Sequence, residues 1–350
     1  MAYTAIDKPT DYFNTVLYTG NGSSQTITGV GFQADFIWFK ERSSAGEHKL
    51  NNSVLGTNYY LISNSTSGDD TTGSGIQSYN SDGYAVSNAS NINDNTETYV
   101  TWNWLAGGSA SSNTDGDITS SVSANTTAGF SIVSYTGSGT ASDTVGHGLG
   151  VTPAMIIVKN RTEATSWCVA HKSLSTDKVL RLEGTNAEGD IGDGELDSPP
   201  NNSSTFGFNN GTTGTPLKVV NESSDNYIAY CFAEKKGYSK FGSYTGNSNA
   251  DGPFVYTGFK PAFVLAKVSS DTNDWFMFDN KRSTFNAVDD SLFPNKTDAE
   301  STSHVIDFLS NGFKIRDSDG TVNSTGNTYI FMAFAEAPFV SSGGIPTTAR

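Results

Sequence analysis

The segment Tyr99-Val100-Thr101-Trp102-Asn103-Trp104 contains the pattern that decides the fold, because two further versions of it follow along the chain. These versions are Tyr227-Ile228-Ala229-Tyr230-Cys231-Phe232 and Tyr329-Ile330-Phe331-Met332-Ala333-Phe334. In each version the second, fourth and sixth side chains are large and apolar, whereas the third and fifth are mostly small. Side chains alternate between the two faces of a β-strand, so the pattern predicts a strand whose large face points into a core and whose small face lies against another close surface. Since neither face is clearly polar, we expect a central strand.

A second pattern precedes each of these segments. A Tyr-Thr-Gly turn is followed, after 22, 24 and 23 residues counted from tyrosine to lysine, by the end of an apolar run. The three runs are Phe36–Lys40, Met155–Lys159 and Phe263–Lys267. The common order predicts three diverged copies of one domain. We expect each lysine to surface at the end of its strand, with its stem over apolar area and its ammonium in water.

The rest of the chain predicts the fold class. No segment shows helical periodicity over ten or more residues, and short apolar runs alternate with turns rich in Gly, Asn, Asp and Ser. This pattern is typical of an all-β protein. We therefore predict three tandem antiparallel β-sandwich domains of seven or eight strands each, with a jelly-roll-like or lectin-like topology.

The repeats also predict the domain boundaries. The stretch between the first two copies is rich in Gly, Ser, Asn and Thr, which indicates an extended linker. Only Lys235, Lys236 and Gly237 separate the second and third copies, so we expect these two to form a compact pair and the first copy to sit apart. The expected divisions are an N-terminal segment 1–12, repeat 1 at 13–106, a linker 107–129, repeat 2 at 130–236, repeat 3 at 237–337 and a C-terminal tail 338–350.

Charge and cysteine content exclude several classes of function. The 350 residues include 21 basic and 36 acidic side chains, and the net charge of −15 disfavours nucleic acid and anionic membranes as partners. No apolar stretch is long enough for a membrane-spanning helix, and the N-terminus lacks the apolar core of a secretory signal peptide. Cys168 and Cys231 cannot form a disulfide framework, and we expect two buried thiols.

Two stretches carry a family resemblance. Residues 128–137, continued by 146–161 with its Gly146-His147-Gly148 turn, resemble a repeat of unknown biochemical function that is common in structural proteins and tail fibres of marine tailed bacteriophages. Residues 11–33 resemble the N-terminal copy in the same proteins, and the resemblance extends over about residues 3 to 337. The third copy departs from the pattern because it has Tyr256-Thr257-Gly258 at the histidine turn. The resemblance implies a virion protein without a defining catalytic motif.

The residue types needed for catalysis are not arranged in any motif. His48, His147, His171 and His304 have no metal-ligand spacing, and no nucleophile elbow or nucleotide-binding loop is present. We therefore predict no enzyme, no catalytic residue, no cofactor and no metal site. One acidic loop leaves two alternatives open, an ordinary solvent-exposed loop or a calcium site. Its acidic residues are Glu188, Asp190, Asp193, Glu195 and Asp197.

Two classes of function fit these observations. In the first, the protein is a tail fibre or other virion appendage, made in the host bacterial cytoplasm and acting through self-association and docking to other virion proteins. A homo-oligomer is expected, with a trimer favoured. In the second, it binds a host-surface glycan, with Tyr59, Tyr60 and Trp167 as candidate stacking platforms. A head decoration protein and a glycan depolymerase are the lesser alternatives.

Overall fold

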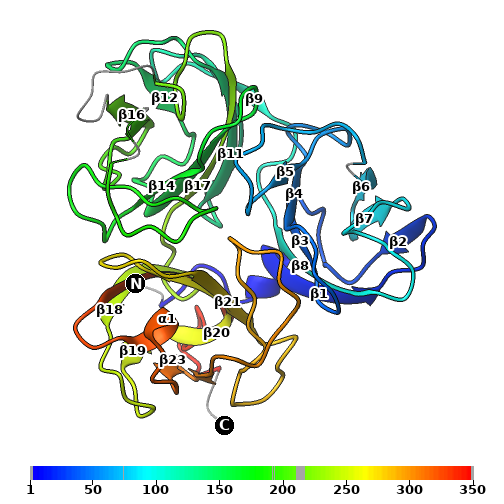
Figure 1. Cartoon of the computed structure of the whole chain (residues 1–350), viewed down its shortest axis with the longest axis vertical. Helices are drawn as coiled ribbons and strands as arrows, with labels where there is room; N and C mark the ends of the chain where they lie inside the picture. The colour runs from blue at the N-terminus through cyan, green and yellow to red at the C-terminus, as the bar shows by residue number, and fades with distance from the viewer. Residues whose placement is uncertain (1–2, 74, 191, 193, 210–216, 348–350) are drawn as a thin grey trace.

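The computed structural model describes residues 3–73, 75–190, 192, 194–209 and 217–347. Three β-sandwiches surround a common centre, one for each repeat (Figure 1). Each sandwich consists of one large sheet and one three-stranded sheet, and every strand pairing inside these sheets is antiparallel. The helices within the described residues are short: the 3-10 helix η1 (Pro9–Asp11) and α1 (Gly320–Asn323). The prediction of an all-β protein with several sandwiches is confirmed.

Repeat 1 has a large sheet with the order β1-β8-β3-β4-β5 and a small sheet with the order β2-β7-β6. The closing strand β8 lies between the first strand and the apolar run, as its doubly covered pattern predicts. The bounds are β1 Phe13–Thr19, β2 Gln25–Ile27, β3 Phe36–Glu41, β4 Lys49–Asn52, β5 Leu61–Ile62, β6 Ile76–Asn80, β7 Gly83–Val86 and β8 Thr98–Trp104.

Repeat 2 repeats this arrangement and enlarges it. Its large sheet has the order β14-β13-β17-β11-β10-β9, and its small sheet has the order β12-β16-β15. Strands β11, β17, β13 and β14 correspond to β1, β8, β3 and β4, whereas β9 and β10 have no counterpart in repeat 1. The bounds are β9 Ser111–Asn113, β10 Ser120–Asn125, β11 Phe130–Thr136, β12 Thr144–Gly146, β13 Met155–Asn160, β14 Cys168–His171, β15 Glu195–Leu196, β16 Thr205–Asn209 and β17 Asn226–Phe232.

Repeat 3 is the simplest version of the fold. Its large sheet has the order β18-β24-β20-β21, and its small sheet has the order β19-β23-β22. The edge strands β18 and β19 correspond to β11 and β12 of repeat 2. The bounds are β18 Ser239–Thr245, β19 Phe254–Tyr256, β20 Phe259–Val268, β21 Trp275–Asp279, β22 Ile306–Leu309, β23 Gly312–Ile315 and β24 Thr328–Pro338.

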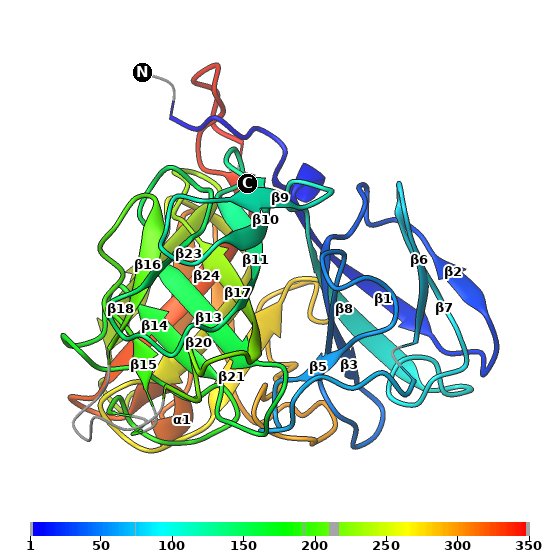
Figure 2. The ribbon, with the colours of Figure 1, turned by 90° about the horizontal axis from the view of Figure 1, so that it is seen from above.

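The large faces of the closing strands meet in one shared core. Buried apolar side chains from all three large sheets form a single cluster that includes Trp104, Phe232 and Phe334. The ring of Trp104 lies 5.7 Å from Phe334 and 6.3 Å from Phe232, centroid to centroid, so one side chain of repeat 1 contacts both other repeats. The small sheets lie on the outside of the molecule (Figures 1 and 2).

The small faces of the closing strands lie against the small sheet of their own sandwich. Each repeat has a private core on this side, and Cys231 and Phe331 belong to two of these cores. Short side chains suit this face because the two sheets approach each other closely. In repeat 1 the hydroxyl of Thr101 also hydrogen-bonds that of Tyr84 at 2.8 Å. The large and small faces predicted from the sequence are therefore both covered, by different partners.

The recurring Tyr-Thr-Gly turn has a structural role in each repeat. Its tyrosine stacks on the first tyrosine of the closing strand, with centroid separations of 5.0, 5.1 and 4.9 Å. The hydroxyl of Tyr135 donates to the carbonyl of Val220 at 2.6 Å, and that of Tyr244 donates to Val322 at 2.7 Å. Any side chain on the turn glycine would collide with the facing backbone. The stacked pairs are Tyr18–Tyr99, Tyr135–Tyr227 and Tyr244–Tyr329.

The predicted linker 107–129 is wrong. It contains β9 and β10, and β10 pairs with β11 along its whole length, from Ser120 opposite Tyr135 to Asn125 opposite Phe130. Gly, Ser and Asn side chains offer little apolar periodicity, but their backbone still pairs and adds two strands to the sheet, with β9 at its edge. The expectation that repeat 1 sits apart is wrong for a related reason, since its large face is apolar and is buried only by repeats 2 and 3.

The predicted terminal segments are attached to the body. Ile6 is buried in the shared core, and η1 leads directly into β1. Residues 339–347 fold back on themselves, with a bridge between Val340 and Pro346. The backbone N–H of Ser342 donates to the carboxylate of Asp7, which joins the N-terminal segment to the tail.

The lysines that end the apolar runs are buried, so the prediction that they surface is wrong. Lys40, Lys159 and Lys267 have no exposed area. Each ammonium donates to the carbonyl of the next residue, and those of Lys40 and Lys159 also reach a loop of another repeat, at Thr297 (3.2 Å) and Thr66 (3.0 Å). Carbonyl oxygens replace water here without supplying a counter-charge. Burial therefore lowers the pKa of all three lysines to about 8.

Replacing Trp104 with Ala tests the shared core. We expect the free energy of unfolding to fall by about 3–5 kcal/mol, because a large buried aromatic side chain is lost and the cavity borders all three repeats. Calorimetry should show one cooperative transition in the parent chain and in the variant. Leu17→Ala is the control, since this side chain is 38% exposed. Separate melting of repeat 1 would contradict a single core.

The buried lysines predict a pH dependence. Between pH 8 and the ordinary lysine pKa of 10.5, the unfolded chain binds more protons than the folded chain, so the free energy of unfolding should rise with pH in this window. Lys159→Met should reduce the rise measured by urea unfolding from pH 7 to 9.5, since it deletes one of the three buried ammonium groups. Lys281→Met, at an exposed position, should leave the slope unchanged. A variant as steep as the parent would count against buried, protonated lysines.

Candidate functional site

The loops that carry most of the candidate residues dock on a neighbouring repeat. Two residues after each lysine, a strand-end carbonyl accepts a hydrogen bond from a backbone N–H of another repeat. Repeat 3 donates to repeat 1, repeat 1 donates to repeat 2, and repeat 2 donates to repeat 3, so the contacts close a ring. The pairs are Glu300 to Arg42 (2.9 Å), Asp69 to Arg161 (2.9 Å) and Glu188 to Ser269 (2.7 Å).

Ion pairs reinforce two of these contacts. The guanidinium of Arg42 binds the carboxylate of Glu300 through two nitrogens, at 2.6 and 2.9 Å. Glu300 also accepts from Arg282 at 3.0 Å. Arg161 contacts Asp69 at 2.6 Å. These charges are partly or fully buried and each is paired, as buried charges require.

A second ring of hydrogen bonds is more deeply buried. Its residues occupy one equivalent position on β4, β14 and β21, the strands that pair with the apolar runs. Asn52 donates to the hydroxyl of Tyr230 in repeat 2 at 3.0 Å. His171 meets the carbonyl of Phe331 in repeat 3 at 3.2 Å, and Asp279 accepts from the indole of Trp102 in repeat 1 at 3.1 Å. Burial lowers the pKa of His171 to about 3, so the ring is neutral and donates to the carbonyl. Each repeat thus contacts the next through one polar side chain.

The expected glycan platforms belong to these contacts. Trp167 is fully buried, and its indole donates to the carbonyls of Ile62 and Ser65 at 3.0 and 3.1 Å. Tyr60 is buried and donates to Asp70 at 3.1 Å, while Tyr59 lies under the guanidinium of Arg161. The structure therefore places none of the three as an open stacking surface.

The histidines and cysteines have structural surroundings. His147 is buried, and its Nδ1 accepts from the backbone of Leu149 at 3.2 Å. His304 lies 3.3 Å from Asp317, and His48 accepts from the indole of Trp38 at 3.0 Å. Both cysteines are buried and unbridged, as predicted, and burial raises the pKa of Cys231 to about 12 and that of Cys168 further. These thiols are held in the protonated form.

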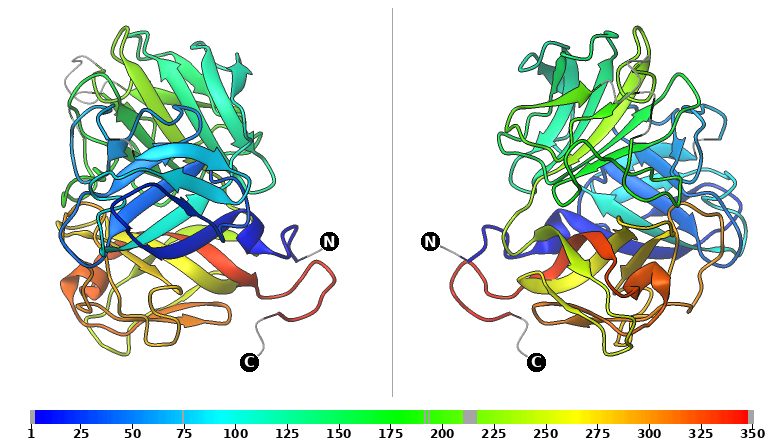
Figure 3. Two further views of the ribbon diagram at one scale, coloured as in Figure 1. Left: turned by 90° about the vertical axis from the view of Figure 1, so that its right-hand side faces the viewer. Right: turned by 60° about the vertical axis from the view of Figure 1, so that its left-hand side comes forward.

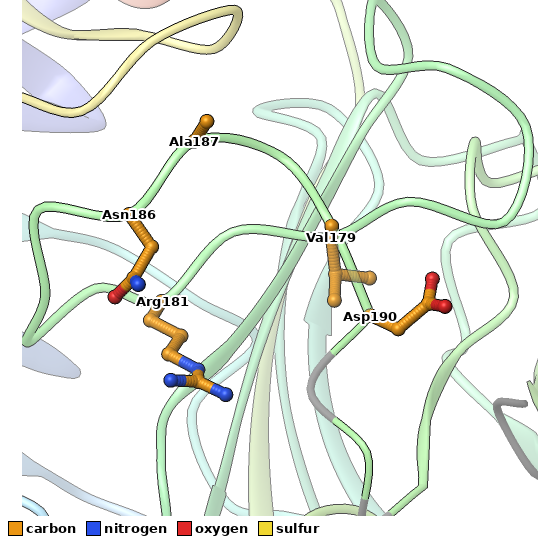
Figure 4. A pocket seen from close by; sticks show the side chains of 6 residues that line it. Val179, Arg181, Asn186, Ala187 and Asp190 are labelled. Atoms are coloured by element: carbon orange, nitrogen blue, oxygen red, sulfur yellow. The ribbon is translucent and has the colours of Figure 1, made fainter. Parts of the chain in front are cut away.

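The acidic loop of repeat 2 borders a shallow cavity of about 300 Å³ (Figure 4). Asp190 at its rim pairs with Lys178 at 2.7 Å, and the carboxylate of Glu188 accepts from Ser175. Glu195 is buried in β15, and Asp197 lies beside Gly207, so these carboxylates do not converge. Asp193 lies outside the described residues. Within the described ranges, no group of three or more His, Cys, Asp or Glu side chains is placed to hold a metal ion.

The most distinctive surface is the end of the molecule where both termini emerge (Figure 3). We call it the terminal pole and define it by residues 3–8, Lys235, Lys236, Tyr256 and residues 339–347. A pocket of about 350 Å³ opens here, lined by Tyr3 to Ile6, Thr127 and the two lysines. The ammonium of Lys236 lies 4.6 Å from the centre of the Tyr3 ring.

The N-terminal arm is anchored in this pole by polar contacts. The hydroxyl of Tyr3 donates to the carbonyl of Gly258 at 2.8 Å and lies 3.3 Å from the hydroxyl of Tyr256. Burial is the main reason that the pKa of Tyr3 is raised, and burial also lowers the pKa of Lys235. The pocket combines an apolar floor with two ammonium groups, an arrangement that can accept an acidic, partly apolar segment. The sequence pattern predicts only a terminal segment and a boundary between repeats at these residues. The adjacent pair Lys235 and Lys236, in a strongly acidic chain, is the feature that could have indicated a binding surface.

The comparisons with known proteins concern the whole fold. No helix in the described part of the chain is long and apolar enough to cross a membrane. No curated protein and no solved structure matches the chain. One family model does match, over residues 8–338, and it therefore includes all three repeats and the strands between them. The chain belongs to the family described as a domain of unknown function, DUF7483.

Proposed function

We propose that the protein is a non-enzymatic structural component of a bacteriophage virion, a tail fibre or other surface appendage. The observation that carries this proposal is the terminal pole, where the N-terminal arm contacts the C-terminal tail through Asp7 and Ser342 beside an open pocket with two lysines. A body held at one end leaves its other surfaces free, which suits an appendage mounted on a particle. The resemblance of residues 128–137 and 146–161 to repeats of phage structural proteins supports the same function.

Attachment through the terminal pole determines which partners are expected. Other virion proteins would bind at the terminal pole, and the protein would be made in the bacterial cytoplasm before assembly. The apolar faces of the large sheets are already buried inside one chain. Self-association, including the trimer favoured above, would therefore use outer surfaces and not the closing strands.

Location on the particle tests the proposal directly. Gold-labelled antibody against the purified chain should decorate a defined part of intact particles under the electron microscope, at the tail, the fibres or the head. Decoration of the head would favour a decoration protein over an appendage. Chain found only in infected cells and never on purified particles would overturn the proposal.

A charge reversal tests the pole itself. Lys235→Glu with Lys236→Glu should reduce incorporation into particles several-fold, because the pocket would lose both ammonium groups. Lys281→Glu is the matched control, since Lys281 is exposed outside the pole. Quantitative immunoblotting of purified particles measures the ratio. Equal incorporation of both variants would exclude the pole as the attachment site.

Host-glycan binding is the second candidate, and one observation favours it. The aromatic rings Phe254, Tyr256 and Phe285 of repeat 3 are 46%, 55% and 84% exposed. Exposed rings can stack on the apolar faces of sugars. Binding to host cells that free lipopolysaccharide or capsule competes away would support this candidate. Release of reducing ends from the same glycan would instead indicate a depolymerase.

A further inference from the structure

The three repeats differ at one equivalent place. In each sandwich the first strand of the large sheet and the first strand of the small sheet lie at the same edge, and we call the gap between them the mouth. The mouth is bordered by β1 and β2 in repeat 1, by β11 and β12 in repeat 2 and by β18 and β19 in repeat 3. Because the framework is shared, differences at the mouth show whether and how each repeat covers its open sheet edge.

In repeat 2 an added strand fills the mouth. β10 pairs antiparallel with β11, and the segment before it bridges to β12, where the N–H of Ile118 donates to the carbonyl of Thr144 at 3.0 Å. The side chains of Ile118 and Val122 are buried in the private core of the sandwich. The segment from Ile118 to Asn125 is uncharged, and the buried residues of β10 are Ser120, Val122 and Ser123. A strand of small, uncharged residues therefore covers this sheet edge in repeat 2.

In repeat 1 side chains close the mouth. The amide of Asn14, on β1, donates to the carbonyls of Gly29 and Val30, both at 3.1 Å. Gln25, on β2, reaches back to the carbonyl of Thr19 at 3.2 Å. The Asn14 bonds join β1 to the segment that follows β2, and the Gln25 bond joins the two strands directly, so side chains span the gap that an added strand fills in repeat 2.

In repeat 3 the mouth is open. Lys240 occupies the position of Asn14 and pairs with Glu234 at 2.7 Å instead of crossing the gap. A cavity of about 400 Å³ lies between β18 and β19, with Gly242, Tyr244 and the exposed ring of Phe254 in its walls. Gly242 replaces Val133 of repeat 2, and the ring of Phe331 from β24 lies over it, so this ring and not a side chain of β18 lines the cavity at this point.

We propose that repeat 3 binds an extended, uncharged segment of a partner protein, which pairs antiparallel with β18 as β10 pairs with β11. Main-chain hydrogen bonds to the edge would supply affinity, and one small or β-branched side chain would enter the mouth. The N–H of Phe241 already lies 3.5 Å from the carboxylate of Glu234, so pairing would use the half of β18 from Ser243 to Thr245. This inference rests on the mouth alone and does not depend on the proposed function.

The partner is a different protein and not a second copy of this chain. The chain's own segment of matching chemistry, β10, is already paired on both sides, with β11 and β9. The tail 339–347 is bonded back on itself and to Gly258, so its backbone is also engaged.

A synthetic peptide with the sequence of residues 118–126, ITSSVSANT, serves as the probe. Fluorescence anisotropy with the full chain should show saturable binding. Ser243→Pro should weaken it at least about tenfold, because proline removes a donor from an edge where a partner strand would pair. Leu17→Pro is the matched control, since Leu17 is the exposed residue at the same position of β1, beside a closed mouth.

Two further measurements keep the test decisive. Phe254→Ser removes one wall of the mouth without touching β18, and it should also weaken binding while the melting temperature stays within a few degrees. No binding of the peptide to the parent chain, or equal binding to Ser243→Pro, would overturn the proposal. Concentration-dependent dimers in light scattering that Ser243→Pro abolishes would replace the partner protein with a second copy.

Discussion

Each large sheet of this protein has two apolar faces, and the second face can be covered only by the other two repeats. Trp104, Phe232 and Phe334 therefore meet at one centre, and the three sandwiches must fold around it together. A single repeat of this kind would expose a broad aromatic surface to water, which costs far more free energy than a small domain has in reserve. The rest of the structure depends on this constraint.

Polar groups near the shared core follow from it. A buried lysine, histidine or asparagine is tolerated only where hydrogen bonds replace its hydration. Lys159 is surrounded by carbonyls, and His171 and Asn52 each reach the next repeat. Apolar packing alone would allow several arrangements of three similar domains. The directional bonds select one cyclic order, since each donor finds its acceptor only on the correct neighbour.

The proposed functions rest on features that differ between the repeats. The framework positions recur and serve in folding in all three repeats, so the candidate binding surfaces lie where the repeats differ. The terminal pole lies beside Tyr3 and Lys236, and the open mouth of repeat 3 lies beside Gly242 and Phe254. A triplicated fold in this way supplies a stable body from its common residues and leaves its exceptional residues for recognition.

The sequence by itself determined the three copies, the all-β class, the central position of the closing strands and the burial of the cysteines, because strand periodicity and turn chemistry are local. Only the tertiary structure decided what covers each apolar face. The alternation in Tyr99–Trp104 shows that both faces of the strand are covered. The pattern of residues is the same whether a face is covered by a neighbouring repeat or by a neighbouring sheet, so it does not identify the partner. For the same reason the sequence pattern predicts a linker at Ser120–Asn125 and a surface position for Lys40, and both predictions are wrong. A strand of small polar residues is specified by the backbones of its partner strands, and a buried ammonium by carbonyls that lie far away in the sequence.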